Sequence, residues 1–220
     1  MAVLDHQKTI DLDLTGEQDD PRLGTDFLFG PARGKMFGVL ICHDREGREV
    51  SLRAYSGQYN GLWQVPGWAP PLFDLPIFNR LNQTGEPRVK AFTRQLECSQ
   101  PGSPEYTALF KQRKTLSRSL MQDLHRLYRL HNFRGQSASL HEAWSGTNGI
   151  PTGSGDCCAP KLLNQAARLD LRPNSIAEFY WGLKNPSASR AQGRFYPSCH
   201  NKCAPILGFL LCGLEDNPTP

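Results

Sequence analysis

Two neighbouring runs near the start of the chain resemble strands: the first is continuously apolar, and in the second apolar and polar positions alternate. The first is "MFGVLICHD", residues 36–44, and the second is "REVSLRAYSG", residues 48–57. Two strand-like runs around a short turn that contains glycine predict a β-hairpin. The stretch that follows, "GLWQVPGWAPPLFDLP", contains Trp63, Trp68 and four prolines. It predicts irregular structure, because proline fixes φ and has no amide donor.

A helical period appears further along the chain. Leucines keep helical spacing from Pro104 to about Leu130, with Ser103 and Pro104 as N-cap and first helical residue. Residues 80–103, which end in "SQPGSP", predict only a helix fragment or a loop. Residues 137–144 predict a short helix.

The last third predicts a helix, a strand, a loop and a second helix. "CAPKLLNQAARL" predicts a helix that begins near Ala159, "SIAEFYWGL" a strand, and "CAPILGFLLCGL" a short apolar helix. With the hairpin and the long central helix, these segments predict an α/β chain of the α+β kind. Cysteines precede both helices of this last third, so we expect them at helix N-termini.

The pattern also predicts how the chain is divided. Residues 1–34, which are polar and broken by Gly and Pro, predict a loosely ordered arm. Residues 35–215 predict one accessory domain, and residues 216–220 the start of a linker to a domain that is missing here. The parts of the accessory domain are the hairpin and Pro/Trp segment at 35–75, the basic helix at 104–134 and the cysteine-containing helix–strand–helix at 150–215.

Composition narrows the class of protein. The 220 residues are 39% hydrophobic and 21% charged, which suits a packed domain and excludes global disorder. The start has no secretory signal pattern, and the longest apolar run is too short for a membrane helix, so we expect a cytoplasmic protein without a membrane partner. Seven cysteines, an odd number in a reducing compartment, argue against a disulfide framework.

The positive charge is concentrated in one segment. The chain has a net charge of +4, whereas residues 104–134 alone carry +5, which leaves the remainder near −1. A solvated helix face is the commoner explanation of such a segment, but it usually mixes both signs, so this excess favours RNA as a partner. We expect no DNA partner. The residues predicted to contact RNA are Lys111, Arg113, Lys114, Arg118, Arg126 and Arg129.

Three cysteines predict a structural zinc site. Cys157, Cys199 and Cys203 are expected at two helix N-termini, where the dipole favours the thiolate that zinc binds. The C-x3-C spacing falls within the usual range for zinc ligands. The alternative is that these are ordinary buried cysteines, as predicted for Cys42, Cys98 and Cys212. The fourth ligand stays open among Cys158, His200 and water.

The helix–strand–helix layout is also similar to that of zinc-dependent nucleobase deaminases, whose signature pairs H-x-E or C-x-E with P-C-x-x-C. Pro197, Cys199 and Cys203 match the second half only loosely. Ala159 stands where the catalytic glutamate should follow Cys157. Glu178 is a substitute acid, although a structural carboxylate is the simpler interpretation, so deamination is an alternative function.

Several blocks resemble the N-terminal extension of long bacterial RluA-type RNA pseudouridine synthases. They include "FGVLICHDREGREVSLRAYSGQYNG", "LHNFRGQSASLHEAW", "GDC" followed by "CAPKLL", "AEFYWG" and "FYPSCHNKC", and they extend from about residue 36 to residue 215. The resemblance implies modification of ribosomal or transfer RNA, and it makes Cys157 the family-like cysteine.

The resemblance also shows what is missing from this chain. The family's catalytic aspartate lies in an H-R-L-D motif, but the nearest match, "HRLY", places Tyr128 where the aspartate should be. We therefore expect a domain that contacts RNA, does not catalyse by itself, and works with a synthase domain in cis or in trans. A third hypothesis is a docking module that uses the long helix and the Trp63/Trp68 stretch.

Overall fold

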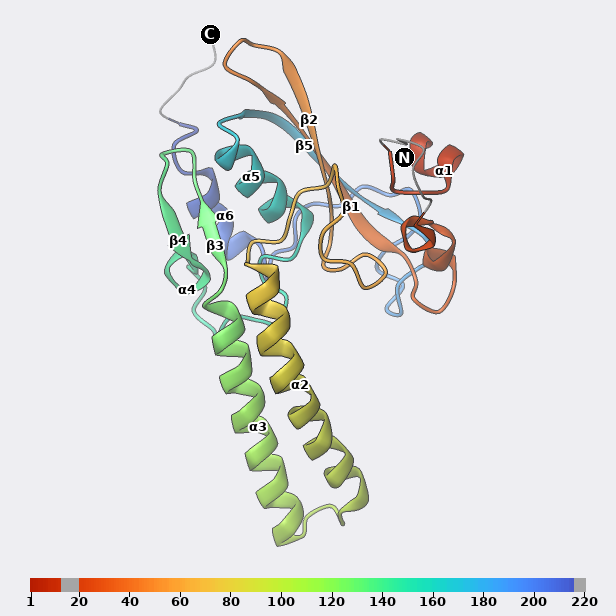
Figure 1. Cartoon of the computed structure of the whole chain (residues 1–220), viewed down its shortest axis with the longest axis vertical. Coiled ribbons are helices and arrows are strands. Elements are labelled where there is room, and N and C mark those ends of the chain that lie inside the picture. Colours follow the sequence, from red (N-terminus) through yellow and green to blue (C-terminus); the bar gives the residue numbers. More distant parts are fainter. Residues whose placement is uncertain (13–19, 216–220) are drawn as a thin grey trace.

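The centre of the molecule is a small antiparallel sheet. The computed structural model describes residues 1–12 and 20–215. Strands β1 (Lys35–His43), β2 (Glu49–Tyr55) and β5 (Arg172–Trp181) lie in the order β2-β1-β5, and β1 is antiparallel to both neighbours (Figure 1). This arrangement confirms the α+β class and the N-terminal hairpin. The predicted linker at residues 216–220 lies outside the described residues.

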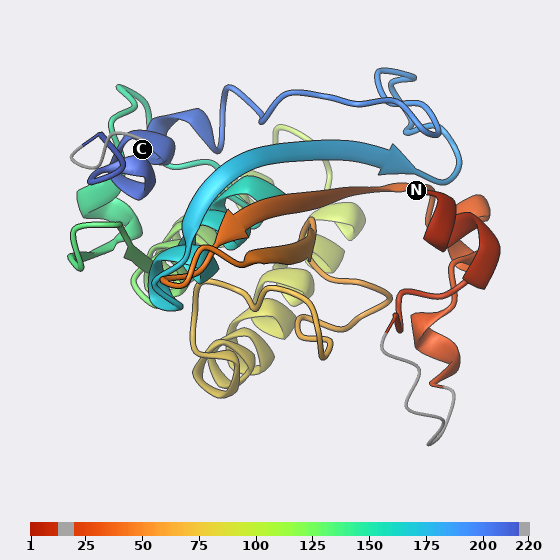
Figure 2. The same ribbon diagram turned by 90° about the horizontal axis from the view of Figure 1, so that it is seen from above.

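Each face of the sheet packs into its own cluster of buried hydrophobic residues. Alternate residues of a strand point to opposite faces, so Phe37 and Phe179 lie on one face while Leu40 and Cys42 lie on the other. The first face is covered by the N-terminal segment and the second by helix α5 (Cys158–Arg168). Figure 2 shows the N-terminal segment at one end of the sheet and helix α6 at the other.

The prediction of a loosely ordered arm is wrong for the described residues 1–12 and 20–34. They form helix α1 (Ala2–Gln7) and two short 3-10 helices, η1 (Pro21–Leu23) and η2 (Asp26–Phe29). Single apolar side chains from these turns are buried against the sheet: Leu4, Ile10, Leu23 and Leu28. Trp68 is also buried, and its indole Nε1 donates to the carbonyl of Ile10 at 2.8 Å, so it is no exposed docking residue.

Two long helices form an antiparallel hairpin that stands out from the body (Figure 1). They are α2 (Leu75–Cys98) and α3 (Pro104–His125). The N-cap prediction for α3 is confirmed, because Ser103 accepts a hydrogen bond from the amide of Tyr106. The prediction of a helix fragment or loop for residues 80–103 is wrong, because α2 is continuous as far as Cys98.

Helix α2 continues through residues that usually interrupt helices. Pro87 lies inside it and has no amide to donate. Gly85 faces α3 so closely that a Cβ there would lie 2.4 Å from a methyl carbon of Leu120. Packing against α3 therefore compensates for two weak helix formers.

Helix α3 ends at His125, five residues before the predicted end, and the chain turns into a small ribbon. Strands β3 (Arg129–His131) and β4 (Ser137–Ser139) pair, and helix α4 (Leu140–Ala143) follows with a Ser139–Glu142 capping box. The backbone amide of Arg129 donates to the carbonyl of Leu72 at 2.7 Å, which ties the end of α3 to the start of α2.

Helix α5 crosses the sheet close to its backbone. A Cβ on Gly38 would lie 2.6 Å from the Cβ of Cys158, so glycine at this position allows the N-terminus of α5 to approach β1. Helix α6 (Ala204–Leu211) packs beside it through the buried Ile206 and Leu210. Among the helices of residues 1–12 and 20–215, none is both long and apolar enough to cross a membrane.

Candidate metal centre

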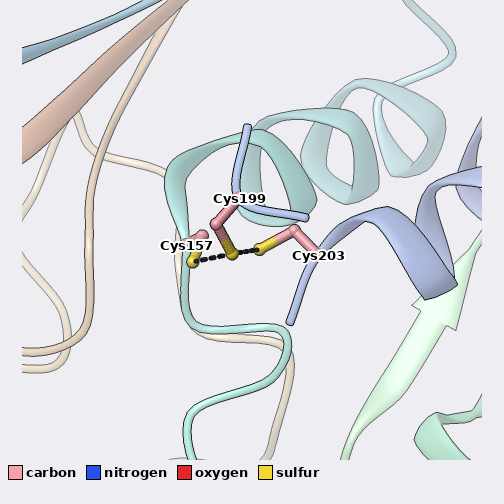
Figure 3. A group of neighbouring side chains, drawn as sticks. All are labelled: Cys157, Cys199 and Cys203. Atoms are coloured by element: carbon pink, nitrogen blue, oxygen red, sulfur yellow. Dashed lines mark hydrogen bonds between the residues drawn. The ribbon is translucent and has the colours of Figure 1, made fainter. Parts of the chain in front are cut away.

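Three thiols converge where α5 and α6 begin (Figure 3). The Sγ atom of Cys199 lies 3.7 Å from that of Cys157 and 3.3 Å from that of Cys203. All three sulfur atoms lie within 4.8 Å of one another. The structure thus brings together the three cysteines that the sequence predicted as ligands.

Local backbone structure explains this convergence. Cys157 is the N-cap of α5 and Cys203 is the N-cap of α6, as the sequence predicted. The carbonyl of Cys199 accepts hydrogen bonds from the amides of Cys203 and Ala204, at 3.2 and 3.1 Å. This turn places the Cys199 thiol beside that of Cys203.

The spacing of the sulfur atoms suits a tetrahedral thiolate site. A zinc ion with bonds of about 2.3 Å to thiolates separates its sulfur ligands by about 3.8 Å. The Cys157–Cys199 distance of 3.7 Å is close to that value, and the Cys199–Cys203 distance of 3.3 Å is shorter. The three side chains lie near enough to hold a metal ion. Among the described residues, no further Cys, His, Asp or Glu joins the cluster, and His200 is exposed outside it.

Mutual hydrogen bonding makes one thiol of the cluster easy to ionise. The side chains of Cys157 and then Cys203 lower the pKa of Cys199 to about 2, and the same contact with Cys199 raises the pKa of Cys157 to about 12. A cluster that already favours one thiolate loses fewer protons when a cation binds.

A buried glutamate joins the two segments that carry the thiols. Glu178 on β5 is 8% exposed, and burial raises its carboxyl pKa. Its Oε1 accepts from the amide of Ala159 at 2.9 Å, and its Oε2 accepts from the hydroxyl of Ser198 at 3.0 Å. Ala159 follows Cys157 by two residues and Ser198 precedes Cys199, so one carboxylate holds both ligand segments in place.

The remaining cysteines have other environments. Cys158 is buried, and its thiol donates to the carbonyl of Met36 at 3.4 Å. Cys42 is buried under the sheet, as predicted, and Cys212 is half-buried. The prediction that Cys98 is buried in the core is wrong, because this residue is exposed at the end of α2.

The predicted RNA-binding residues have different surroundings. Lys111, Lys114 and Arg118 are exposed on α3. The others have partners within the protein: the Arg113 Nε donates to Thr93 at 2.9 Å, Arg126 pairs with Asp123 at 2.9 Å, and Arg129 donates to the carbonyls of Arg126 and Tyr128.

Further cations lie on the helix that the sequence did not predict. Helix α2 adds four basic residues to the hairpin: Arg80, Arg88, Lys90 and Arg94. Residues 75–125 hold eight Lys and Arg against four Asp and Glu, a net +4 that equals the charge of the whole chain. The basic surface is therefore the α2–α3 hairpin and not one helix.

Comparisons with known proteins give no match: no protein-family profile, no curated protein and no solved structure is significantly similar to this chain.

Proposed function

We propose that the chain is an RNA-contacting accessory domain of a cytoplasmic RluA-type pseudouridine synthase, with a structural zinc ion held by Cys157, Cys199 and Cys203. The main support for the RNA role is the α2–α3 hairpin, which protrudes from the body. Its net charge of +4 equals the net charge of the whole chain. Catalysis belongs to a synthase domain that acts in cis or in trans.

The hairpin has the chemistry that a phosphate backbone recognises. Lys111, Lys114 and Arg118 are exposed and have no ion-pair partner in the described part of the chain. Cations that neutralise phosphates release condensed counterions, which gives an affinity that falls steeply with salt. The two helices lie side by side in the protruding hairpin, so basic residues of α2 add to these cations (Figure 1).

Zinc has a structural role in this proposal. Bound to the three thiolates, the ion would join the start of α5 to the start of α6 and stabilise the body from which the hairpin extends. Glu178 uses both carboxylate oxygens to hold the ligand segments, which supports a structural centre more than a catalytic one.

Filter binding to transfer RNA or ribosomal RNA fragments tests the RNA role. A Lys111→Gln, Lys114→Gln, Arg118→Gln triple variant should lower the affinity strongly and reduce the salt slope by about two to three. The matched control neutralises three exposed cations of the body, Arg45, Lys184 and Arg194, with the same change in net charge. Equal losses in both variants, or no RNA affinity at low salt, would reject the proposed role.

Deaminase-type zinc chemistry is the second candidate. The observation in its favour is Glu178, a buried carboxyl of raised pKa between the two cysteine segments. Zinc-loaded protein should then release ammonia from cytidine, adenosine or guanine compounds, and Glu178→Gln should abolish that release. Zinc-loaded protein without ammonia release removes this candidate and leaves the structural zinc site in place.

A further inference from the structure

A cleft lies at the root of the α2–α3 hairpin, where the hairpin joins the body. It has a volume of about 440 Å³ and lies between the start of α2, the end of α3, strand β3 and helix α5. Its polar lining comes from residues far apart in the sequence: Asp74, Arg126, Arg129, His131, Asn164 and Arg168. Sequence patterns alone do not place Arg168 beside the other two arginines.

Hydrogen bonds within the protein fix the walls of the cleft. The amide of Arg129 donates to the carbonyl of Leu72 at 2.7 Å, and the amide of His131 donates to Oδ1 of Asn164 at 2.7 Å. The guanidinium of Arg129 is itself anchored, because Nη1 donates to the carbonyl of Arg126 at 2.8 Å. The other nitrogens of this guanidinium, Nε and Nη2, have no hydrogen-bond partner among the described residues. An arginine that is already anchored loses little freedom when it binds a ligand.

The side chains that line the cleft carry a net positive charge. Three arginines line it against one carboxylate, Asp74, which already caps α2 by accepting from the amide of Ile77 at 2.9 Å. The N-terminus of α2 adds about half a positive charge, and the C-termini of α3 and α5 each add about half a negative charge. Two carboxylates outside the lining offset more of this charge, because Asp123 pairs with Arg126 and Glu142 interacts electrostatically with Arg129. Arg168 has no such partner among the described residues.

Arg168 is the arginine with the greatest freedom to bind a ligand. It is exposed at the end of α5, and its side chain has no hydrogen-bond or ion-pair partner within residues 1–12 and 20–215. Arg126, by comparison, pairs with Asp123. Arginine presents a planar fork of donors that matches two oxygens of a phosphate group.

We propose that this cleft binds a backbone phosphate of the RNA that lies along the hairpin, with Arg129 and Arg168 as the donors. The inference rests on the proposed RNA role and adds a defined anchoring site at the end of the hairpin nearest the body. A phosphate held there would fix how far along the hairpin the RNA lies.

The test measures binding of transfer RNA to the full chain carrying Arg168→Ala, Arg168→Lys or, as control, Arg194→Ala. Arg194 is also exposed but lies away from the cleft. Loss of one phosphate contact lowers the salt slope by about one and the affinity at about 0.1 M salt by five- to tenfold. We expect this for Arg168→Ala, partial retention for Arg168→Lys and little change for Arg194→Ala.

Other outcomes overturn the inference in distinguishable ways. If Arg168→Ala binds as tightly as Arg194→Ala while the hairpin triple variant loses affinity, the cleft is no phosphate site and the RNA role stands. If the wild type binds no RNA, the proposed function fails with it. If inorganic pyrophosphate raises the melting temperature of the wild type but not of Arg168→Ala, and RNA does not compete, the ligand is a free phosphate compound.

Discussion

Removal of one thiol from the cysteine cluster should destabilise the protein by a measurable amount. Cys199 is the informative position, because its sulfur lies between the other two, at 3.7 and 3.3 Å. Cys199→Ser replaces a thiolate ligand with a hydroxyl that zinc binds poorly. The folded state should then lose the stabilisation that a metal bound only to the native protein provides.

The size of the effect follows from ligand linkage. Free zinc at about 100 times its dissociation constant stabilises the native state by about 2.7 kcal/mol. In a chain of this length, each kcal/mol shifts the melting temperature by about 2–4 °C, so the expected loss is about 5–10 °C. A chelator should lower the melting temperature of the wild type by a similar amount and should leave Cys199→Ser unchanged.

The assay combines thermal unfolding, followed by circular dichroism, with elemental analysis of the same samples. Cys98→Ser is the matched control, since Cys98 is an exposed cysteine outside the cluster, and it should retain zinc and the response to the chelator. If the wild type, purified without chelator, contains no zinc, and neither the chelator nor Cys199→Ser changes its melting temperature, the cluster holds no stabilising metal ion.

Three further predictions concern the residues around the centre. Glu178→Ala leaves the amide of Ala159 and the hydroxyl of Ser198 without their acceptor and should weaken zinc binding about 10–100-fold in chelator competition. Glu178→Gln keeps an acceptor and should stay within a few-fold of the wild type. Equal losses in the two variants would show that the Glu178 carboxylate does not hold the ligand segments in place. Gly38→Ala forces a Cβ against Cys158 and should cost about 1–3 kcal/mol in urea unfolding, while Gly149→Ala, which meets no neighbouring atom, should cost much less. Burial lowers the pKa of Lys161 from 10.5 to about 8, so the cost of its buried charge is full below pH 8 and declines as pH rises toward 10.5. The stability of the wild type relative to Lys161→Met should therefore rise by about 3 kcal/mol over that window, and a constant difference would show that the lysine is not buried in its charged form.

Local patterns were enough to predict several elements and the cysteine cluster. The hairpin, α3 and the two C-terminal helices each have a hydrophobic period and end signals within their own residues. The starts of both helices are recognisable from "CAPKLL" and "CAPILG", so the sequence predicts Cys157 and Cys203 at helix N-termini. Their convergence follows from two helices that pack side by side.

Other features depend on contacts between distant residues. Gly85 and Pro87 argue locally against a helix, and only the packing of α2 against α3 makes that stretch helical. The register of β1 with β5 pairs Gly38 with Glu178, and this pairing brings the carboxylate under the start of α5. Arg168 gives no signal beyond that of a basic residue in the last turn of a helix.

The salt dependence of RNA binding shows whether the α2–α3 hairpin contacts RNA. Zinc-loaded protein should bind a structured RNA with a slope of log affinity against log salt of about −3 or steeper, set by the three exposed cations of α3 and the arginine cleft. Between about 50 and 200 mM salt this slope corresponds to a loss of roughly 60-fold. Absence of binding at about 50 mM salt, or an affinity that does not change with salt, would contradict RNA contact by the hairpin.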